Sequence, residues 1–217
     1  MLNFFILILI YTCIYAFMSL GQNLITGYTG MLSLCAAGFF AVGSYTTAIL
    51  TTKFAWSFWA TLPVAAILAA LMGVLIGLPT LRLKGDYLAI ATLGFAEIVR
   101  NIINNWDALT NGPMGIQRIP MITIFGLKIS PYQKYGFLLM EIILLAVCWF
   151  LFERLASSRM GRALEAIRED EIAANSMGIN VTKYKVVSFA LGAAVTGIAG
   201  CLQAEFTLSV SPGSYVF

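Results

Sequence analysis

The chain has 217 residues, of which 60% are hydrophobic and only 11% are charged. Soluble domains carry roughly 25% charged residues, so a soluble domain is excluded and lipid is the expected solvent for most of the chain. The net charge of +3 is small, and no histidine is present, which excludes Ser-His-Asp and Cys-His nucleophilic sites.

Six segments are apolar and long enough to cross a bilayer, which takes about 20 residues. In chain order they are 4–20, 32–51, 58–79, 87–103, 135–152 and 185–204. No basic residue precedes the first segment and no small-residue cleavage site follows it, so we expect a retained helix rather than a signal peptide. The predicted fold class is all-α: a single polytopic transmembrane domain over 1–217, with about six spanning helices.

A glycine-rich linker over 21–31 joins the first two segments and contains Gly21, Gly27 and Gly30. Non-helical backbone at membrane depth is tolerated only where protein or a water-filled cavity covers it. Two interpretations therefore remain open: an ordinary glycine turn, or a broken or re-entrant segment that lines a pathway.

The third and sixth segments carry small residues at every fourth position, which favours close packing against a neighbouring helix. They are Ala65, Ala69, Gly73 and Gly77 in the third, and Ser188, Gly192, Thr196, Gly200 and Ala204 in the sixth, with Gly197 as a further packing glycine. The expected neighbour is a helix of this chain rather than another subunit.

Charged residues inside the spans are costly and therefore informative. Glu97 and Arg100 lie three residues apart on one helical face, which predicts an intramembrane ion pair. A structural pair against a neighbouring helix is favoured over contact with a substrate. Glu141 has no local partner, so we expect it to reach water near the outer interface, with no second intramembrane acid beside it.

Lysine and arginine in the loops predict the orientation in the membrane. The turn at 80–86 and the loop at 153–184 are expected in the cytoplasm, and the N-terminus and the connection at 104–134 are expected outside. The cytoplasmic loops contain Arg82, Lys84, Arg154, Arg159, Arg162, Arg168 and Lys183, against Arg118, Lys128 and Lys134 in the outer connection.

The loop at 153–184 contains an amphipathic stretch, GRALEAIREDEIAANSMGIN (161–180). It predicts one surface helix from about Arg162 to Met177. Ser157 or Ser158 lies near its start, and Gly178 is placed to end it in a left-handed conformation. The apolar face contains Ala163, Leu164, Ile167, Ala174 and Met177. Docking into a groove of a cytosolic protein and a solvated connector remain open, whereas the mixed charges disfavour a helix lying on the inner leaflet.

That stretch, followed by KYKVVSFALGAAVTGIAG (183–200), resembles the coupling loop and next helix of bacterial branched-chain amino-acid ABC permeases. LPTLRLKGDYLAIATLGFAEIVR (78–100) and TNGPMGI (110–116) resemble the LivM-type subunit rather than its LivH-type sister, and 20–45 matches a third family stretch. The chain departs from the family at Leu34-Cys35-Ala36, near which relatives have Gly-His. Because relatives continue beyond Ser211-Pro212, we expect the chain to be truncated at its C-terminus.

The resemblance implies a permease subunit of an ABC importer for leucine, isoleucine and valine in the bacterial cytoplasmic (inner) membrane. It also implies two cytosolic ATP-binding subunits, a LivH-type sister permease and a periplasmic amino-acid binding protein as partners, with no nucleic acid. The residues expected to couple the permease to the ATPases are Arg162, Arg168, Glu169, Asp170, Glu171, Ala173, Ala174 and Gly178.

No catalytic residue, metal or cofactor is expected, and the chain has no Gly-x-x-x-x-Gly-Lys-Ser/Thr loop to bind phosphates. Hydrolysis of ATP is therefore expected on separate subunits, so the chain is not predicted to be an enzyme. The alternatives are an ABC permease for urea, amides or sugars, and an ion-coupled secondary transporter.

Overall fold

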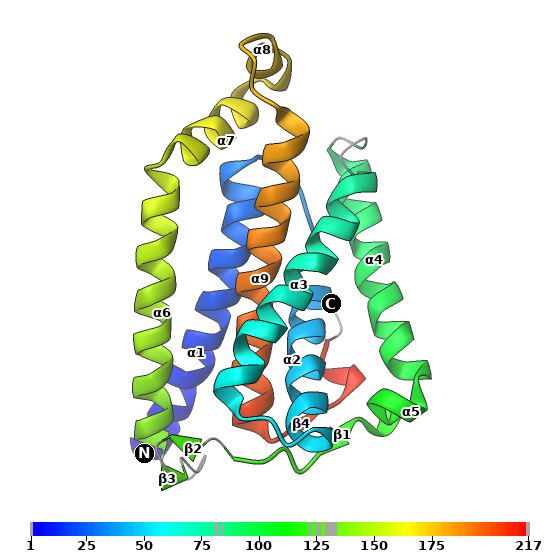
Figure 1. Ribbon diagram of the computed structural model, residues 1–217, viewed down its shortest axis with the longest axis vertical. Coiled ribbons are helices and arrows are strands. Elements are labelled where there is room, and N and C mark those ends of the chain that lie inside the picture. The colour runs from blue at the N-terminus through cyan, green and yellow to red at the C-terminus, as the bar shows by residue number, and fades with distance from the viewer. Residues whose placement is uncertain are drawn as a thin grey trace.

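The computed structural model describes residues 2–80, 83, 85–121, 123–124, 127–128 and 134–215. Six long helices form one bundle (Figure 1): α1 (Leu2–Gln22), α2 (Ala36–Lys53), α3 (Phe58–Thr80), α4 (Asp86–Asn105), α6 (Lys134–Ala156) and α9 (Val181–Thr207). In the described part of the chain, four helical segments are long and apolar enough to cross a membrane, and they belong to α1, α3, α6 and α9. The all-α bundle is confirmed.

The helices α2 and α4 correspond to the other two predicted spans but are less apolar. Hydroxyl side chains lower the hydropathy of α2, and charged and amide side chains lower that of α4. The serine and threonine hydroxyls of α2 find acceptors inside the bundle: Ser44 donates to the Gly200 carbonyl at 2.9 Å, and Thr47 and Thr51 donate to carbonyls one turn back. Six spanning helices therefore remain a prediction.

The two ends of the bundle carry different connections (Figure 1). One end has the N-terminus, α5 (Asp107–Thr110), a 3₁₀ turn η2 (Gly112–Met114) and β1 (Ile116–Gln117), which pairs antiparallel with β4 (Ser209–Val210). A second antiparallel pair, β2 (Thr123–Ile124) with β3 (Leu127–Lys128), lies there too, and η3 (Pro212–Tyr215) follows β4.

The opposite end has α7 (Arg159–Glu169), α8 (Glu171–Ser176), the end of α3 and the start of α4. The connections predicted to face the cytoplasm thus share one end of the bundle, and those predicted to face outward share the other. Arg82 and Lys84, which are among the basic residues that predict a cytoplasmic location for the turn at 80–86, lie outside the described residues.

The helix α9 lies at the centre of the bundle and packs against α1, α2 and α3. A Cβ added at Gly73 of α3 would lie 2.7 Å from the Phe189 carbonyl oxygen, and one at Gly197 would lie 2.5 Å from Ala69 Cβ, so the two backbones approach closely. At Gly77 the nearest atom, Phe189 Cβ, is an ordinary 3.5 Å away.

The row of small residues on α9 contacts several neighbours rather than one. A Cβ at Gly192 would lie 2.6 Å from the Gly21 carbonyl oxygen of α1, whereas one at Gly200 would overlap the Phe40 carbonyl of α2. Four residues advance about 400° around a helix, about 40° more than a full turn, so a row of this spacing winds around α9. The expectation of a single packing face was therefore wrong for this helix.

The first helix ends in an irregular segment that delays the start of α2. It passes from Gln22 into a π-helix, η1 (Asn23–Tyr28), and residues 29–35 are not helical. The predicted start of the second helix at Leu32 was wrong, because side chains of other helices bind this backbone: Leu34 N donates to the Thr92 hydroxyl of α4 at 3.0 Å, and the Gln22 amide donates to the Ser33 carbonyl.

In Figure 1 this segment returns from the η1 end toward the middle of the bundle, where α2 begins. The contact with Thr92, in the second turn of α4, agrees with that path. Of the two interpretations of the linker, a broken segment describes it and a simple turn does not. We refer to residues 23–35 as the broken segment.

Candidate coupling site

The segment that joins α6 to α9 forms two helices instead of the single predicted one. The break is at Asp170, whose backbone is extended (φ −153°, ψ 111°). Its carboxylate accepts from Ile172 N at 2.8 Å and Ala173 N at 3.0 Å, so it caps α8 from outside the helix. An aspartate that caps in this way competes with continuation of the preceding helix. We refer to α7 and α8 together as the coupling segment.

The ends of the coupling segment are formed by residues that the sequence singled out. The Ser158 hydroxyl accepts from Met160 N at 3.1 Å and Gly161 N at 3.4 Å, which makes it the N-cap of α7. Gly178 has φ +84° and follows the end of α8, in the left-handed region that glycine adopts without strain. Both ends therefore lie close to where the pattern predicted them.

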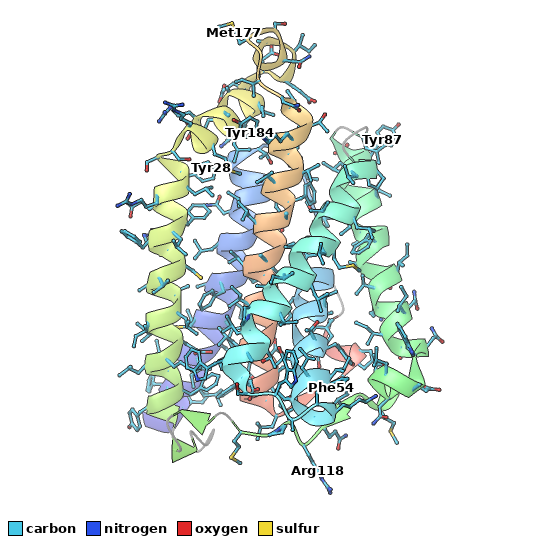
Figure 2. All side chains as sticks on the ribbon, in the orientation of Figure 1. Tyr28, Phe54, Tyr87, Arg118, Met177 and Tyr184 are labelled. Carbon is cyan, nitrogen blue, oxygen red and sulfur yellow. The ribbon has the colours of Figure 1, made fainter. Side chains whose placement is uncertain are left out.

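Most of the predicted apolar face is buried against the bundle. Ala163, Leu164 and Ile167 of α7 and Ala174 of α8 are buried. Met177 is the exception, at 84% exposed, and Ile172 in the first turn of α8 is 74% exposed. Figure 2 shows Met177 at the tip of the molecule, pointing away from the bundle. Met177 is the C-cap of α8 and lies beyond its last helical residue, whereas Ala174 inside α8 stays buried.

The predicted coupling residues lie in three different environments. Arg162, Glu169 and Ala173 are exposed, and the Arg162 guanidinium donates to the Ser157 carbonyl at 3.0 Å. Glu171 forms an ion pair at 2.8 Å with Lys185, which is only 7% exposed, and so connects α8 to α9.

Arg168 differs from the other predicted coupling residues because its side chain extends to η1. Its Nη1 donates to the Gly27 carbonyl at 2.7 Å, in η1. In addition to its buried apolar face, the coupling segment makes polar contacts with Lys185 of α9 and with the broken segment.

A cavity of about 820 Å³ lies between α1, the broken segment and α6. Its wall is mostly apolar, with a few polar side chains, and the residues that line it include Gln22, Thr26, Leu34, Leu145 and Trp149. Asn23 and Gly27 of η1 border both this cavity and a smaller one of about 270 Å³ that Glu165 and Arg168 also line. The π-helix therefore separates the coupling segment from the larger cavity.

Two carboxyl groups are buried inside the bundle, at the end away from the coupling segment. Glu141 of α6 is fully buried and Glu205 of α9 is 2% exposed. Among the described residues, neither carboxyl has a hydrogen-bond partner. The expectation that Glu141 reaches water was wrong, because α6 turns this residue into the bundle.

Glu205 is a residue that the sequence reasoning missed. It lies one position beyond the predicted end of the last span, whereas α9 continues to Thr207. An acid at the end of a long apolar helix was the available signal. Glu205 is therefore a second buried acid, on a different helix from Glu141.

The pair Glu97 and Arg100 lies on α4. Arg100 donates from Nη2 at 2.7 Å and from Nε at 3.0 Å to one carboxylate oxygen of Glu97. The side chain of Arg100 is 36% exposed and that of Glu97 is 41% exposed. This geometry neutralises both charges locally, and the pair occupies a partly open face of α4.

The sequence matches the family model described as "Branched-chain amino acid transport system / permease component" over residues 4–217. The chain belongs to this family of permease components. Together with the four apolar helices, this membership makes it a multi-pass membrane protein.

Individual members of the family are similar over most of the chain. The high-affinity branched-chain amino acid transport system permease protein LivM of Escherichia coli (strain K12) is 41% identical over 95% of this chain and 53% of its own length. The probable LivM permease of Methanocaldococcus jannaschii is 28% identical over 70% of this chain and 44% of its own length. The LivH permease of E. coli is 24% identical over 91% of this chain and 68% of its own length.

This chain spans about half the length of the LivM permeases that it matches. The higher identity to LivM than to LivH agrees with the motif comparison. No solved structure matches the chain significantly.

Proposed function

We propose that this chain forms part of a permease subunit of an ABC importer that moves leucine, isoleucine and valine across the bacterial inner membrane. Separate cytosolic subunits, two per transporter, hydrolyse ATP. A LivH-type sister permease completes the pathway, and a periplasmic binding protein delivers the amino acid. The substrate class and the sister permease are transferred from relatives whose names give branched-chain amino acid transport and LivH, over the half of the LivM length that this chain covers. The ATP-hydrolysing subunits and the binding protein rest on the resemblance of the sequence to ABC permeases.

The observation that carries the coupling part of this proposal is the shape of the coupling segment. It projects beyond the bundle, where Ile172 and Met177 are large apolar side chains that are mostly exposed (Figure 2). The neighbouring helix α7 carries exposed charges, as at Arg162 and Glu169. A helical pair with an apolar tip, anchored at its base by Glu171 and Lys185, suits docking into a groove of a cytosolic protein better than a solvated connector.

The test is leucine uptake into cells that carry the complete gene and its neighbours, with Gly178→Pro and Gly178→Asn as matched variants. Proline fixes φ near −65° and is incompatible with the +84° at this position, whereas asparagine tolerates the left-handed region. We expect ATP-dependent uptake that is lost in the proline variant and kept in the asparagine variant, at equal membrane levels. Uptake that survives Gly178→Pro would contradict the coupling mechanism.

One observation favours the alternative of an ion-coupled secondary transporter. Such proteins use buried acids in the membrane, and Glu141 and Glu205 are both buried. Leucine uptake into membrane vesicles supplied with ATP separates the two functions. A protonophore abolishes proton-coupled uptake there but leaves ATP-driven uptake. Family membership and the coupling segment favour the ABC importer.

A further inference from the structure

We infer that Arg168 is a positioning residue that transmits movement of the coupling segment to the broken segment (23–35), and through it to the wall of the 820 Å³ cavity. This inference rests on the proposed function and adds the route by which motion at the ATPase side reaches the membrane pathway. It gives Arg168 a role inside the permease, in place of the ATPase contact expected from the sequence.

Arg168 contacts the broken segment in two ways, through a hydrogen bond and through packing of its aliphatic stem. Arg168 Nη1 donates to the Gly27 carbonyl at 2.7 Å. Its aliphatic stem lies against Gly30, where an added Cβ would be 3.0 Å from Arg168 Cγ and 3.6 Å from Arg168 Cβ. Gly30 also has φ +67°, so this backbone turn suits glycine and leaves room for the arginine stem.

The end of a helix explains why an arginine binds there. The chain leaves the helical conformation after η1, so the last carbonyls of η1 have no following helical turn to bind them and carry the negative end of the helix dipole, which a cation stabilises. Ser188 of α9 donates to the Leu24 carbonyl at 2.8 Å, and Thr29 donates to the Ile25 carbonyl. Among the described residues of the coupling segment, Arg168 is the one that donates a hydrogen bond to a carbonyl of η1, that of Gly27.

The broken segment connects this contact to the rest of the bundle. Leu34 N donates to the Thr92 hydroxyl of α4, and Leu32 and Leu34 line the cavity. Residues 29–35 have no helical hydrogen bonds of their own to resist displacement. Movement of α7 therefore displaces the cavity wall, whereas α8 is anchored to the central helix α9 through Lys185.

The first experiment measures ATP hydrolysis and leucine uptake together, for the complete transporter in proteoliposomes with its binding protein. Arg168→Met keeps the aliphatic stem and removes the donor. Arg159→Met is the control, since Arg159 is exposed on the same helix and belongs to none of the proposed contacts. We expect uptake per ATP hydrolysed to fall about tenfold in Arg168→Met, with hydrolysis retained, and Arg168→Lys to restore part of it.

Unchanged uptake per ATP in Arg168→Met would overturn the inference. A parallel fall of hydrolysis and uptake would also overturn it, since that result places Arg168 at the ATPase surface. If the wild-type protein shows no ATP-dependent uptake of leucine, the proposed function is contradicted instead. The cross-linking experiment then tests the contact between Arg168 and the broken segment by itself.

The second experiment uses the double variant Gly30→Cys/Arg168→Cys. The 3.6 Å between the two Cβ positions matches the spacing of a disulfide, so mild oxidation should join the coupling segment to the broken segment. We expect uptake per ATP to be low in the reduced protein and to recover on oxidation, because the disulfide replaces the arginine contact. The single cysteine variants control for strain at Gly30 and for the native cysteines. Absence of the cross-link, or oxidation that lowers uptake further, would overturn the inference.

Discussion

Glu141 and Glu205 place two carboxyl groups among apolar side chains, at positions where charge is expensive. A buried polar group without a partner costs about 1–3 kcal/mol relative to one that is paired or solvated. Each carboxyl is therefore either neutral or paired in the assembled transporter. By contrast, the ion pair of Glu97 and Arg100 is partly exposed, and such pairs contribute about 0–1 kcal/mol.

We predict that Glu141→Leu raises the free energy of unfolding by about 1–3 kcal/mol, because it removes an unpaired polar group. The measurement is denaturant unfolding of the complete protein in detergent micelles. Glu97→Gln serves as the control and should change stability by less than about 1 kcal/mol. A marked loss of stability in Glu141→Leu would contradict this prediction and show that the carboxyl has a stabilising partner within the complete protein.

At the scale of elements, one capping side chain shapes the coupling segment. Asp170 ends α7 and caps the start of α8, which carries the exposed Ile172 and is followed by the exposed Met177. The surface proposed to dock on the ATPase therefore includes a short helix whose start is capped by one aspartate.

Asp170→Ala should destabilise α8 by about 1 kcal/mol, since it leaves Ile172 N and Ala173 N without their acceptor. Asparagine caps nearly as well, so Asp170→Asn should behave like the wild type. Amide hydrogen exchange across α8 measures the difference. Equal exchange in the alanine and asparagine variants would contradict the capping role.

The central helix α9 depends on glycines at its contacts with the neighbouring helices. Gly192→Leu should prevent close packing against α1, where even a Cβ would lie 2.6 Å from the Gly21 carbonyl oxygen and from Ile25 Cγ1. Overpacking of this kind costs about 1–3 kcal/mol or more. Gly94→Leu is the matched control on α4, because a Cβ there meets nothing within 4 Å. Size-exclusion chromatography after extraction should show loss of monodisperse protein for Gly192→Leu alone.

At the scale of the whole molecule, the bundle separates its connections into two ends, with Arg118 at one and Met177 at the other (Figure 2). The excess of lysine and arginine predicts that the end with Met177 lies in the cytoplasm. In intact cells, a membrane-impermeant maleimide should label Arg118→Cys and leave Met177→Cys unlabelled until the cells are opened. Wild-type protein gives the background of the native cysteines, and the reverse pattern would invert the topology.

The membrane class, the family and the presence of six long helices could be predicted from the sequence, because they follow from composition, from the length of apolar runs and from local motifs. It also located the end of α8 at Gly178 and the start of α7 near Ser158, since caps are local signals.

Only the tertiary structure decided which neighbours the glycines of α9 contact, that residues 29–35 stay non-helical, that Glu141 is buried, and that Arg168 reaches Gly27. Each of these depends on donors, acceptors or backbone supplied by segments far away in the chain. Helical periodicity states which residues share a face, but the identity of what covers that face is set by packing.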